Sequence, residues 1–463
     1  MDKIIKLEQW DANRIKCFNP VSSKFVQQAL AYKSKEMAYN PHYGRMALQE
    51  VSKSFATTIK SVTTFPAGLL EFVKEKAKKQ RKLVIYNQLE IPRILLKFKP
   101  ELPNIKFEDY QSTLLGFVGI HKRGILVSST GSGKSIIIGG IISKLRIPKT
   151  VIVCPNRTIF SQLFESMEKW FGRNMVGMFG SSIYNESRIN VCMYQSLKKC
   201  HVKPELLIVD EGHEVNPSIV NFITKNCVNT HYRYGMTATP QRFESNFEKA
   251  ASMVGYIGPI LHEVDESLVS ARVLPVVVKF VKWHSSVIGK NPTYQKVLRE
   301  YILFDETRNT NLLKAAKEEL DNGRNTLVLI DEIEQGKRMH EIAGKLGIES
   351  HLVHGKMKPE EIDKIKKDLN DRKINFAIAT KVFGVGTDIP NVDCIVLGSS
   401  RKSHIDTVQK IGRGRRRTKH FDDLVVIDSM DSFKQKVWNK IVNGHSMQRL
   451  QTYEEKKWTI LKS

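Results

Sequence analysis

The sequence predicts an α/β protein with two parallel β-sheets in tandem, preceded by a small α+β domain. From about residue 123, short apolar runs rich in β-branched residues alternate with longer amphipathic runs. Short buried runs are typical of strands covered on both faces, and their alternation with helices indicates a parallel sheet. A second series with the same rhythm begins near residue 325. The chain is therefore expected to contain two sheets of one type.

The two series define the expected elements in chain order. In the first series we expect strands at 123–129, 149–155 and 205–211, and helices at 133–145 and 158–171. In the second we expect strands at 325–331, 349–355, 375–380, 392–398 and 423–429, and helices at 334–346, 358–369 and 404–412. The stretch between the series, about 242–280, is the expected linker.

The first ~95 residues do not follow this alternation. They combine short strand candidates with an amphipathic helix at 66–82, and we interpret them as a separate domain. The predicted regions are a basic α+β domain (1–95), two parallel-sheet domains (96–265 and 266–445) and a basic C-terminal tail (446–463).

Charge is the most informative compositional property. The chain has 73 Lys and Arg against 48 Asp and Glu, a net charge of +25. Residues 1–100 hold 19 Lys and Arg against 8 Asp and Glu, a net of +11 in about a fifth of the chain. This imbalance favours nucleic acid as a partner over a generically basic protein.

Cysteine usage and hydropathy favour a cytoplasmic protein, in the host cytoplasm if the protein is viral. The six cysteines are scattered and form no C-x-x-C pair, which argues against zinc and a disulfide framework and for a reducing compartment. No apolar run approaches the ~20 residues that span a bilayer, and the N-terminus lacks the apolar core of a secretory signal. No membrane partner is expected.

The sequence SSTGSGKS, residues 128–135, follows an expected strand and opens an expected helix. Glycines at 131 and 133 let the backbone wrap a phosphate with its N–H groups pointing inward at the helix N-terminus. Lys134 would reach the β- and γ-phosphates of ATP, and the Ser135 hydroxyl would bind Mg²⁺. The predicted ATP contacts are Ser128, Ser129, Thr130, Gly131, Ser132, Gly133, Lys134 and Ser135. The alternative is a chance turn, since Ser128 stands where the simple pattern has Gly.

The sequence DEGH, residues 210–213, ends an expected buried strand in two carboxylates. Ionised carboxylates at the carboxyl edge of a parallel sheet need a cation or a polar network. Asp210 is predicted to hold Mg²⁺, and Glu211 to orient the attacking water. His213 could link the nucleotide site to a neighbouring motif. Alone, the tetrapeptide could cap a helix; with the phosphate loop upstream, it indicates a hydrolase.

The sequence QKIGRGRRR, residues 409–417, has four arginines in five residues. The second series has no G-K-[ST] of its own, so its domain must contribute something other than a phosphate loop. Arg413 and Arg416, three residues apart on a helix start, can face one γ-phosphate as arginine fingers. Arg415 and Arg417 are predicted to face solvent or backbone phosphates. A plain basic patch and a nuclear-localisation signal are the alternatives.

Taken in order, these motifs resemble those of the superfamily 2 helicases and translocases. The matches are STGSGKS to motif I, VCPNRTIFSQ to Ia, VCMYQSL to Ib, DEGH to II, MTATPQR to III, VHG to a further motif, IATKVFGVGTDIP to V and QKIGRGRR to VI. The resemblance implies two RecA-like motor domains and assigns Gln409 to the catalytic set. It also implies that Gly386 and Asp388, at the ATP site, and Thr237 and Thr239 couple nucleotide state to strand grip.

The resemblance extends to two flanking features. FEDYQ is similar to the adenine-reading element of the superfamily, which nominates Tyr110 and Gln111. Gly212 departs from both the DEAD and the DEAH form of motif II, so this motif places the chain in neither RNA-helicase group.

The tracking strand in this superfamily is gripped mainly through backbone phosphates. The positions that would contact it lie just past strand ends: Asn156, Arg157, Tyr194 and Gln195 in the first sheet, and His354, Gly355 and Thr380 in the second. For Tyr194, an aromatic packed at the edge of the core is the alternative interpretation.

Near the N-terminus, MAYNPHYGRMAL and TTFPAGLLEFVKE resemble the small first domain of phage branch-migration helicases of the UvsW type. This resemblance implies an ATP-driven enzyme that acts on branched or forked DNA in recombination, replication or repair. The basic first domain would then hold a duplex arm, and the motor is expected to fold from about residue 96 onward. The alternatives are an RNA-directed helicase, the translocating subunit of a restriction system, and a nucleotide-gated binding module without turnover.

Overall fold

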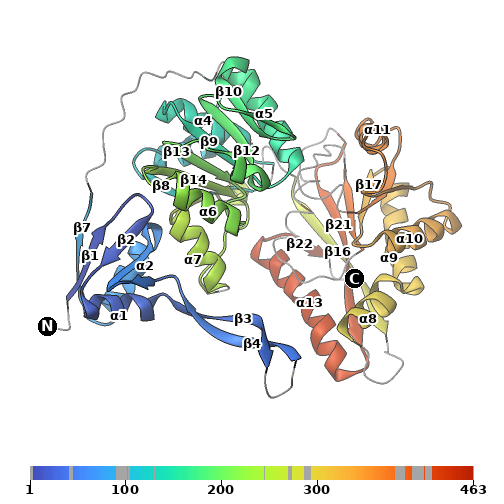
Figure 1. Ribbon diagram of the computed structural model, residues 1–463. Helices are drawn as coiled ribbons and strands as arrows, with labels where there is room; N and C mark the ends of the chain where they lie inside the picture. Colours follow the sequence, from blue (N-terminus) through green and yellow to red (C-terminus); the bar gives the residue numbers. More distant parts are fainter. Residues whose placement is uncertain are drawn as a thin grey trace. The chain divides into compact units, whose positions relative to one another are not determined.

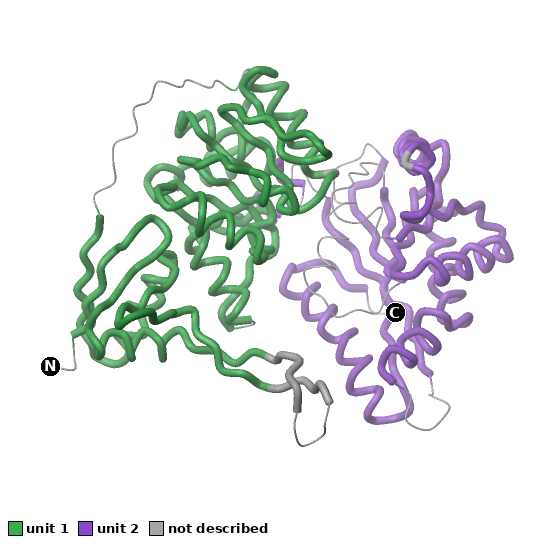
Figure 2. Tube along the Cα trace, in the orientation of Figure 1, with its two compact units in different colours: residues 1–128, 134–264 green, residues 129–133, 265–463 purple. Residues whose placement is uncertain are grey.

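The computed structural model describes most of the chain in two compact units. The described residues are 4–40, 45–89, 102, 105–129, 131–244, 246–269, 274–285, 293–380, 392–398, 411 and 420–461. One unit comprises residues 1–128 and 134–264, and the other comprises residues 129–133 and 265–463 (Figure 2). No helix within these described ranges is long and apolar enough to cross a membrane.

The N-terminal residues form a five-stranded sheet in the order β5-β6-β2-β1-β7 (Figure 1). Its strands are β1 (Ile4–Gln9), β2 (Arg14–Cys17), β5 (Thr57–Ile59), β6 (Val62–Pro66) and β7 (Leu83–Asn87). Exposed and buried residues alternate along β1, as expected for a strand with one covered face. The helices are α1 (Pro20–Ala29) and α2 (Leu70–Lys79), and β3 (Ala31–Asn40) pairs with β4 (Arg45–Ser54) in a separate antiparallel ribbon.

The first large sheet has eight strands in the order β11-β10-β12-β9-β13-β14-β8-β15. They are β8 (Arg123–Val127), β9 (Thr150–Cys154), β10 (Val176–Gly180), β11 (Ile183–Asn185), β12 (Ile189–Met193), β13 (Leu206–Asp210), β14 (Tyr232–Thr237) and β15 (Ile260–Glu263). All neighbours are parallel except β10 and β11. The helices are α3 (Asp109–Phe117), α4 (Lys134–Leu145), α5 (Arg157–Phe171), α6 (Pro217–Asn226) and α7 (Phe247–Tyr256).

The second large sheet has seven strands in the order β18-β19-β17-β20-β21-β16-β22, and every neighbouring pair is parallel. They are β16 (Val276–Ser285), β17 (Thr326–Leu329), β18 (His351–Val353), β19 (Phe376–Ala379), β20 (Cys394–Leu397), β21 (Leu424–Phe433) and β22 (Thr459–Leu461). The α-helices are α8 (Tyr294–Leu298), α9 (Glu306–Asp321), α10 (Ile333–Lys345), α11 (Pro359–Asn370) and α13 (Lys436–Glu455). Two tandem parallel sheets are therefore confirmed; the helix expected at 404–412 falls largely outside the described residues.

Two expected boundaries need correction. The linker is shorter than 242–280, because α7 and β15 belong to the first unit and β16 already begins at Val276. Residues 446–463 are not a separate tail: they continue α13, and β22 pairs with β16. Tyr453 and Trp458 are buried in the core of the second sheet, which outweighs the basic composition that suggested a tail.

The N-terminal sheet and the first large sheet share one hydrophobic core. Its buried members come from both, for example Ile5 and Phe65 from the former and Ile125 and Val209 from the latter. An aromatic cluster joins the two regions as well: Tyr32, Phe55 and Phe72 pack with Phe243 and Phe247. Residues 1–95 are therefore part of the first unit and not a separable domain.

A buried arginine reinforces this junction. Arg233, on β14, is fully buried and donates to the side-chain oxygen of Asn13. It also donates to three backbone carbonyl oxygens, each at 3.0 Å: those of Thr230, Cys227 and Tyr256. The Asn13 amide in turn donates to the carbonyl oxygen of Ile223 at 3.0 Å. Because a buried charge is costly without such partners, Asn13 is integral to the first unit.

Candidate nucleotide and nucleic-acid site

The predicted phosphate loop connects β8 to α4, and both of these elements belong to the first unit. The backbone N–H of Ser128 donates to the carbonyl of Thr237 at 2.9 Å, which ties the start of the loop to β14. Gly131 and Gly133 have φ angles of +86° and +78°, in the left-handed region that favours glycine. The backbone thus turns directly from a strand end into a helix N-terminus, the arrangement that binds phosphate.

Lys134 and Glu211, 77 positions apart, form an ion pair in this loop region. Nζ of Lys134 lies 3.2 Å from Oε1 of Glu211, and the two side chains are 13% and 14% exposed. Glu211 has a φ angle of +51°, an unfavourable conformation for a residue with a side chain, and such strain is concentrated at functional sites. The strand order brings the two residues together, because β14 lies between β8 and β13.

The glycine that departs from the usual form of motif II has a packing reason. The N–H of Gly212 donates to the carbonyl of Met236 at 2.8 Å, so the backbone here lies close to β14. A Cβ atom at Gly212 would lie 3.2 Å from the Cα of Gly235, which is tighter than ordinary contact. A larger residue would require these two segments to move apart.

The two carboxylates of motif II differ in their electrostatics. Burial, together with the charge of Glu211, raises the pKa of Asp210 to about 7. Burial would also raise the pKa of Glu211, but Lys134 and His213 outweigh it and lower that pKa to about 2. Glu211 is therefore ionised at neutral pH, as a residue that orients or deprotonates water must be, whereas Asp210 lacks a sufficient cation.

His213 links motif II to motif III. Nδ1 of this buried histidine lies 2.8 Å from Oγ1 of Thr237 and 3.3 Å from Oε2 of Glu211. Oγ1 of Thr237 also accepts from the backbone N–H of Thr239 at 3.0 Å. The structure thus brings together Glu211, His213, Thr237 and Thr239 in one continuous polar chain.

The donor set fits ATP and Mg²⁺. Two buried oxygens around this edge have no hydrogen-bond partner among the described residues: Oγ of Ser129 and Oγ1 of Thr239. Such orphaned atoms are costly unless a ligand or water meets them. No cluster of three or more His, Cys, Asp or Glu suited to a metal occurs among the described residues. Mg²⁺ needs no such cluster, because it is commonly held by one or two carboxylates together with substrate phosphates.

Tyr110 and Gln111, nominated for adenine, lie at the N-terminus of α3. Both are buried, and Oε1 of Gln111 accepts from the backbone N–H of Glu108 at 3.1 Å in a capping box. This hydrogen bond is a helix-capping interaction, which accounts for a glutamine at this position without any contact to adenine. Adenine contact by these two residues stays a prediction.

The strand-tracking positions of the first sheet gather at neighbouring strand ends. Asn156 and Arg157 follow β9, and Tyr194 and Gln195 follow the adjacent strand β12. Nε2 of Gln195 lies 3.5 Å from the carbonyl of Pro155, Asn156 caps α5, and Arg157 is exposed. Tyr194 packs partly buried against the core, as the alternative interpretation of this aromatic predicted.

In the second unit, His354 and Gly355 follow β18, and Thr380 follows its neighbour β19. The backbone N–H of Thr380 donates to the carbonyl of Val353 at 3.0 Å, so these positions share one edge. The remaining predicted site residues lie outside the described residues: Thr130, Gly386, Asp388, Gln409, Arg413, Arg415, Arg416 and Arg417. Their assignments stay predictions.

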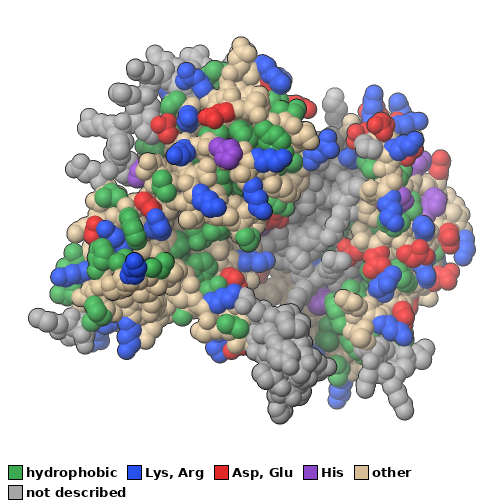
Figure 3. All heavy atoms as spheres, in the orientation of Figure 1, with side chains coloured by type: hydrophobic (Ala, Val, Ile, Leu, Met, Phe, Trp, Pro, Cys, Tyr) green, Lys and Arg blue, Asp and Glu red, His purple; other side chains and the backbone are tan. Residues whose placement is uncertain are grey.

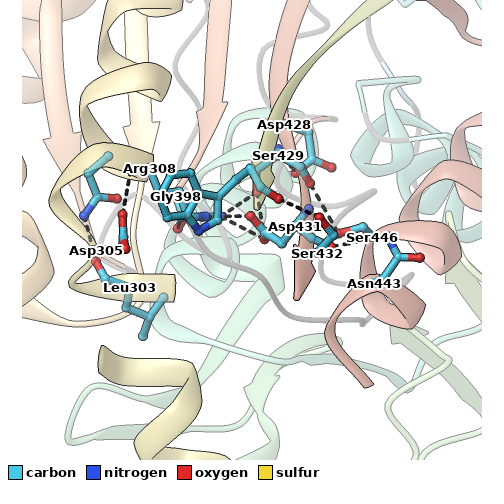
Figure 4. A network of polar contacts seen from close by, with 12 residues as sticks. Leu303, Asp305, Arg308, Gly398, Asp428, Ser429, Asp431, Ser432, Asn443 and Ser446 are labelled. Carbon is cyan, nitrogen blue, oxygen red and sulfur yellow. Dashed lines mark hydrogen bonds and ion pairs between the residues drawn. The ribbon is translucent and has the colours of Figure 1, made fainter. Parts of the chain in front are cut away.

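A buried ion-pair network in the second unit was not predicted (Figure 4). Arg308, on α9, binds Asp431 at 2.8 Å and donates to the carbonyl of Gly398 at 3.0 Å. Arg449, on α13, binds Asp428 at 2.8 Å. The sequence held a signal, since two aspartates lie in a strand that begins with the apolar run 424–427, and a charge on a buried strand requires a partner.

Family models match the two motor regions separately. Residues 86–242 match the type III restriction enzyme, res subunit, and residues 309–418 match the helicase conserved C-terminal domain. These two stretches contain motifs I to III and motifs V and VI, respectively.

Individual relatives are distant. Putative helicase 22 of Sulfolobus islandicus filamentous virus is 27% identical over 362 residues, covering 68% of this chain and 62% of the relative. The chain thus spans less than two thirds of that relative's length. The ATP-dependent DNA helicase uvsW of Enterobacteria phage T4 is 21% identical over 374 residues, covering 74% of each chain.

Among solved structures, S. cerevisiae Dbp5 bound to RNA and ADP BeF3 matches with a TM-score of 0.54 at 15% identity. The match covers 79% of this chain and 94% of that chain, and at this identity it supports the fold alone. Both family models, the motif order and the tandem parallel sheets agree. The chain is a superfamily 2 helicase that resembles the phage helicases of the UvsW type.

Proposed function

We propose that the protein is an ATP-dependent DNA helicase or translocase that remodels branched DNA in recombination, replication or repair. Its substrates would be replication forks, Holliday junctions, D-loops or R-loops. The relative from phage T4, named an ATP-dependent DNA helicase, supports DNA as the substrate.

The first unit supplies the groups for ATP hydrolysis. Lys134 would exchange its contact with Glu211 for the β- and γ-phosphates. Ser135 and Asp210 would hold Mg²⁺, which neutralises charge on the phosphates. Glu211, once released from Lys134, would orient the attacking water, and His213 would report this change to Thr237 and Thr239.

The arginines of motif VI are assigned to the transition state. Arg413 and Arg416 would stabilise charge on the transferred phosphoryl group, with Gln409 beside them. Because these arginines belong to the second motor domain by sequence, hydrolysis would depend on that domain. This dependence is what converts ATP turnover into movement along a strand.

The observation that best supports branch remodelling is the shared core of the N-terminal sheet and the first large sheet. A duplex arm bound by the N-terminal residues would be held rigidly relative to the motor domain that binds ATP. Residues 1–264 carry 37 Lys and Arg against 21 Asp and Glu, a net of +16. Residues 265–463 carry 36 against 27, a net of +9.

The distribution of charge on the surface agrees with this assignment. On the face drawn in Figure 3, Lys and Arg side chains are spread over the first unit, whereas more Asp and Glu side chains are interspersed on the second. Duplex DNA would therefore be attracted more strongly to the first unit.

The deciding experiment measures ATP hydrolysis with single-stranded DNA, duplex DNA, forks and RNA side by side, together with conversion of labelled forks. We expect the strongest stimulation by DNA and ATP-dependent fork conversion. Stimulation by RNA alone would support the RNA-helicase alternative, and turnover confined to long duplexes without fork conversion would support a restriction-type translocase. Nucleic-acid binding without turnover would indicate a nucleotide-gated module.

A further inference from the structure

A cavity of about 510 Å³ lies at the junction of the N-terminal sheet and the first large sheet. Gln9, Lys74 and Tyr86 line it from the N-terminal side, and Lys122, Arg123 and His231 from the other side. Arg123 begins β8 and His231 precedes β14. The cavity is therefore at the amino ends of these parallel strands, the edge opposite to the phosphate loop.

Arg123 is incompletely bonded in this cavity. Its Nη2 donates to the carbonyl of Ala12 at 2.6 Å, but its Nη1 is buried without a hydrogen-bond partner among the described residues. Arg233, by contrast, uses all three of its guanidinium nitrogens. A buried N–H donor without an acceptor costs on the order of 1–3 kcal/mol, more when it is charged, so the free side of Arg123 favours an acceptor from outside the chain.

The surrounding charges do not balance Arg123. Glu71 also lines the cavity, but it is paired with Lys74 at 2.7 Å. Asp11, the acidic group that acts on Arg123, is bound by Arg14 at 2.7 Å. Lys122 therefore adds to an excess of positive charge.

The titration behaviour of the lining agrees with this excess. Burial, with the neighbouring Arg233, lowers the pKa of Arg123 to about 9. Burial and the charges of Arg123, Arg233 and Lys122 lower the pKa of His231 to about 4. Positive charge is thus disfavoured here until an anion enters.

We propose that this cavity binds a phosphate group, with Arg123 as the buried donor and Lys122 as the second cation. The guanidinium fork suits phosphate oxygens, and charge-assisted hydrogen bonds to phosphate are strong. The phosphate could come from a DNA backbone or from a free phosphate compound. Either source makes this a second phosphate site, distinct from the ATP site and independent of whether the protein remodels forks.

The first arm of the test measures binding of inorganic phosphate by calorimetry. The full chain would carry Lys134→Ala to weaken the phosphate loop, so that the cavity dominates the signal. Adding Lys122→Gln or Arg123→Lys should weaken phosphate binding roughly tenfold or more, because the first removes a cation and the second removes the guanidinium fork. Lys78→Gln, which changes an exposed lysine of α2 outside the cavity, is the matched control and should leave the affinity within about twofold.

Folding is checked by the melting temperature in chloride buffer. If Arg123→Lys does not fold, the phosphate affinity of Lys122→Gln still tests the proposal. This variant is expected to fold because the Lys122 side chain is partly exposed. Equal phosphate affinities in Lys122→Gln and Lys78→Gln, or no phosphate binding in the Lys134→Ala chain, would overturn the proposal.

The second arm identifies the source of the phosphate. Duplex DNA affinity is measured across a salt series for chains that carry only Lys122→Gln or only Lys78→Gln. If the cavity holds a backbone phosphate, Lys122→Gln should flatten the slope of log affinity against log salt by roughly one unit more than the control. An unchanged slope, together with lost phosphate binding in the first arm, supports a free phosphate compound as the occupant.

Discussion

The two parallel sheets treat their buried charges in opposite ways. In the first sheet, Glu211 lies 3.2 Å from Lys134 and 3.3 Å from His213, whereas Asp210 forms no ion pair among the described residues. In the second sheet, Arg308 is matched by Asp431 and Arg449 by Asp428, and all four side chains are buried. The two sheets share one strand order apart from the additional antiparallel strand β11 of the first, so topology does not explain the difference.

The contrast separates a binding site from a structural feature. A fully paired network offers nothing to a ligand, and its role is to hold α9 and α13 against β21. An incompletely paired set with shifted pKa values is held ready for a ligand. The pairing of buried charges therefore distinguishes the predicted ATP site from the structural network better than charge content does.

The largest expected effect is at the incompletely paired edge. Lys134→Ala and Glu211→Gln should each reduce ATP hydrolysis by up to ~10⁴-fold, since they remove a phosphate ligand and the residue that activates water. DNA binding and the melting temperature should persist. The control is Glu214→Gln, an exposed carboxylate three residues after Glu211. Near wild-type turnover in either site variant would show that the ATP site is misassigned.

The next effect concerns motif VI, which lies outside the described residues. Arg413→Ala and Arg416→Ala should leave ATP binding nearly intact and reduce turnover by about 10³-fold, the scale of an arginine finger. Arg415→Ala and Arg417→Ala should mainly weaken DNA binding. Steady-state kinetics and nucleotide-binding titrations check this. Equal and purely salt-dependent losses in all four variants would instead indicate a basic patch.

Substitutions in the fully paired network of the second sheet should change the free energy of unfolding. Arg308→Ala should lower the free energy of unfolding by about 3–5 kcal/mol, because it removes the buried guanidinium that balances the charge of Asp431. The double variant Arg308→Met with Asp431→Leu should recover most of this loss, since neither member of this pair is left as a buried charge without the other. Lys317→Ala, on the exposed face of the same helix, should cost under about 1 kcal/mol. A denaturant series measures all three; a small loss for Arg308→Ala would mean that water replaces its partners.

Local sequence patterns were sufficient to predict the two sheets and the strand ends at which the predicted ATP-site residues lie. The runs at 123–129 and 149–155 became β8 and β9 because buried parallel strands need apolar residues on both faces. Lys134 and Glu211, both assigned to the ATP site, lie 3.2 Å apart because the carboxyl ends of parallel strands converge, and their catalytic roles stay predictions. Both inferences depend on sequence patterns that extend over only a few positions of the chain.

Pairings between distant segments were beyond the sequence patterns. Nothing near Asn13 indicates that it bonds Arg233, 220 positions away. Asn156, expected to face a nucleic-acid strand, also caps α5 by accepting from Ile159 at 3.0 Å. Residues 1–95 were expected to form a separate domain because their composition and their pattern of strands and helices differ from those of the following residues. That prediction was wrong because they share one hydrophobic core with the first large sheet.

The smallest expected effect tests that junction. A chain that begins near residue 96 was predicted to fold, but it would expose the shared core and leave Arg233 without Asn13, so we expect it to lose cooperative unfolding. Asn13→Ala in the full chain is the milder test. It removes one acceptor from a buried guanidinium and should lower the free energy of unfolding by about 1–3 kcal/mol.

The matched control is Gln28→Ala, an exposed position on α1 where alanine suits the helix and little change is expected. Urea unfolding of both variants, followed by far-ultraviolet circular dichroism, gives the comparison. A single cooperative transition that moves to lower urea in Asn13→Ala would indicate that the N-terminal sheet and the first large sheet unfold together. Two separate transitions, with only the weaker one moved, would mean that the N-terminal sheet opens by itself. A duplex arm held there could then move relative to the ATP site, which would remove the main structural support for branch remodelling.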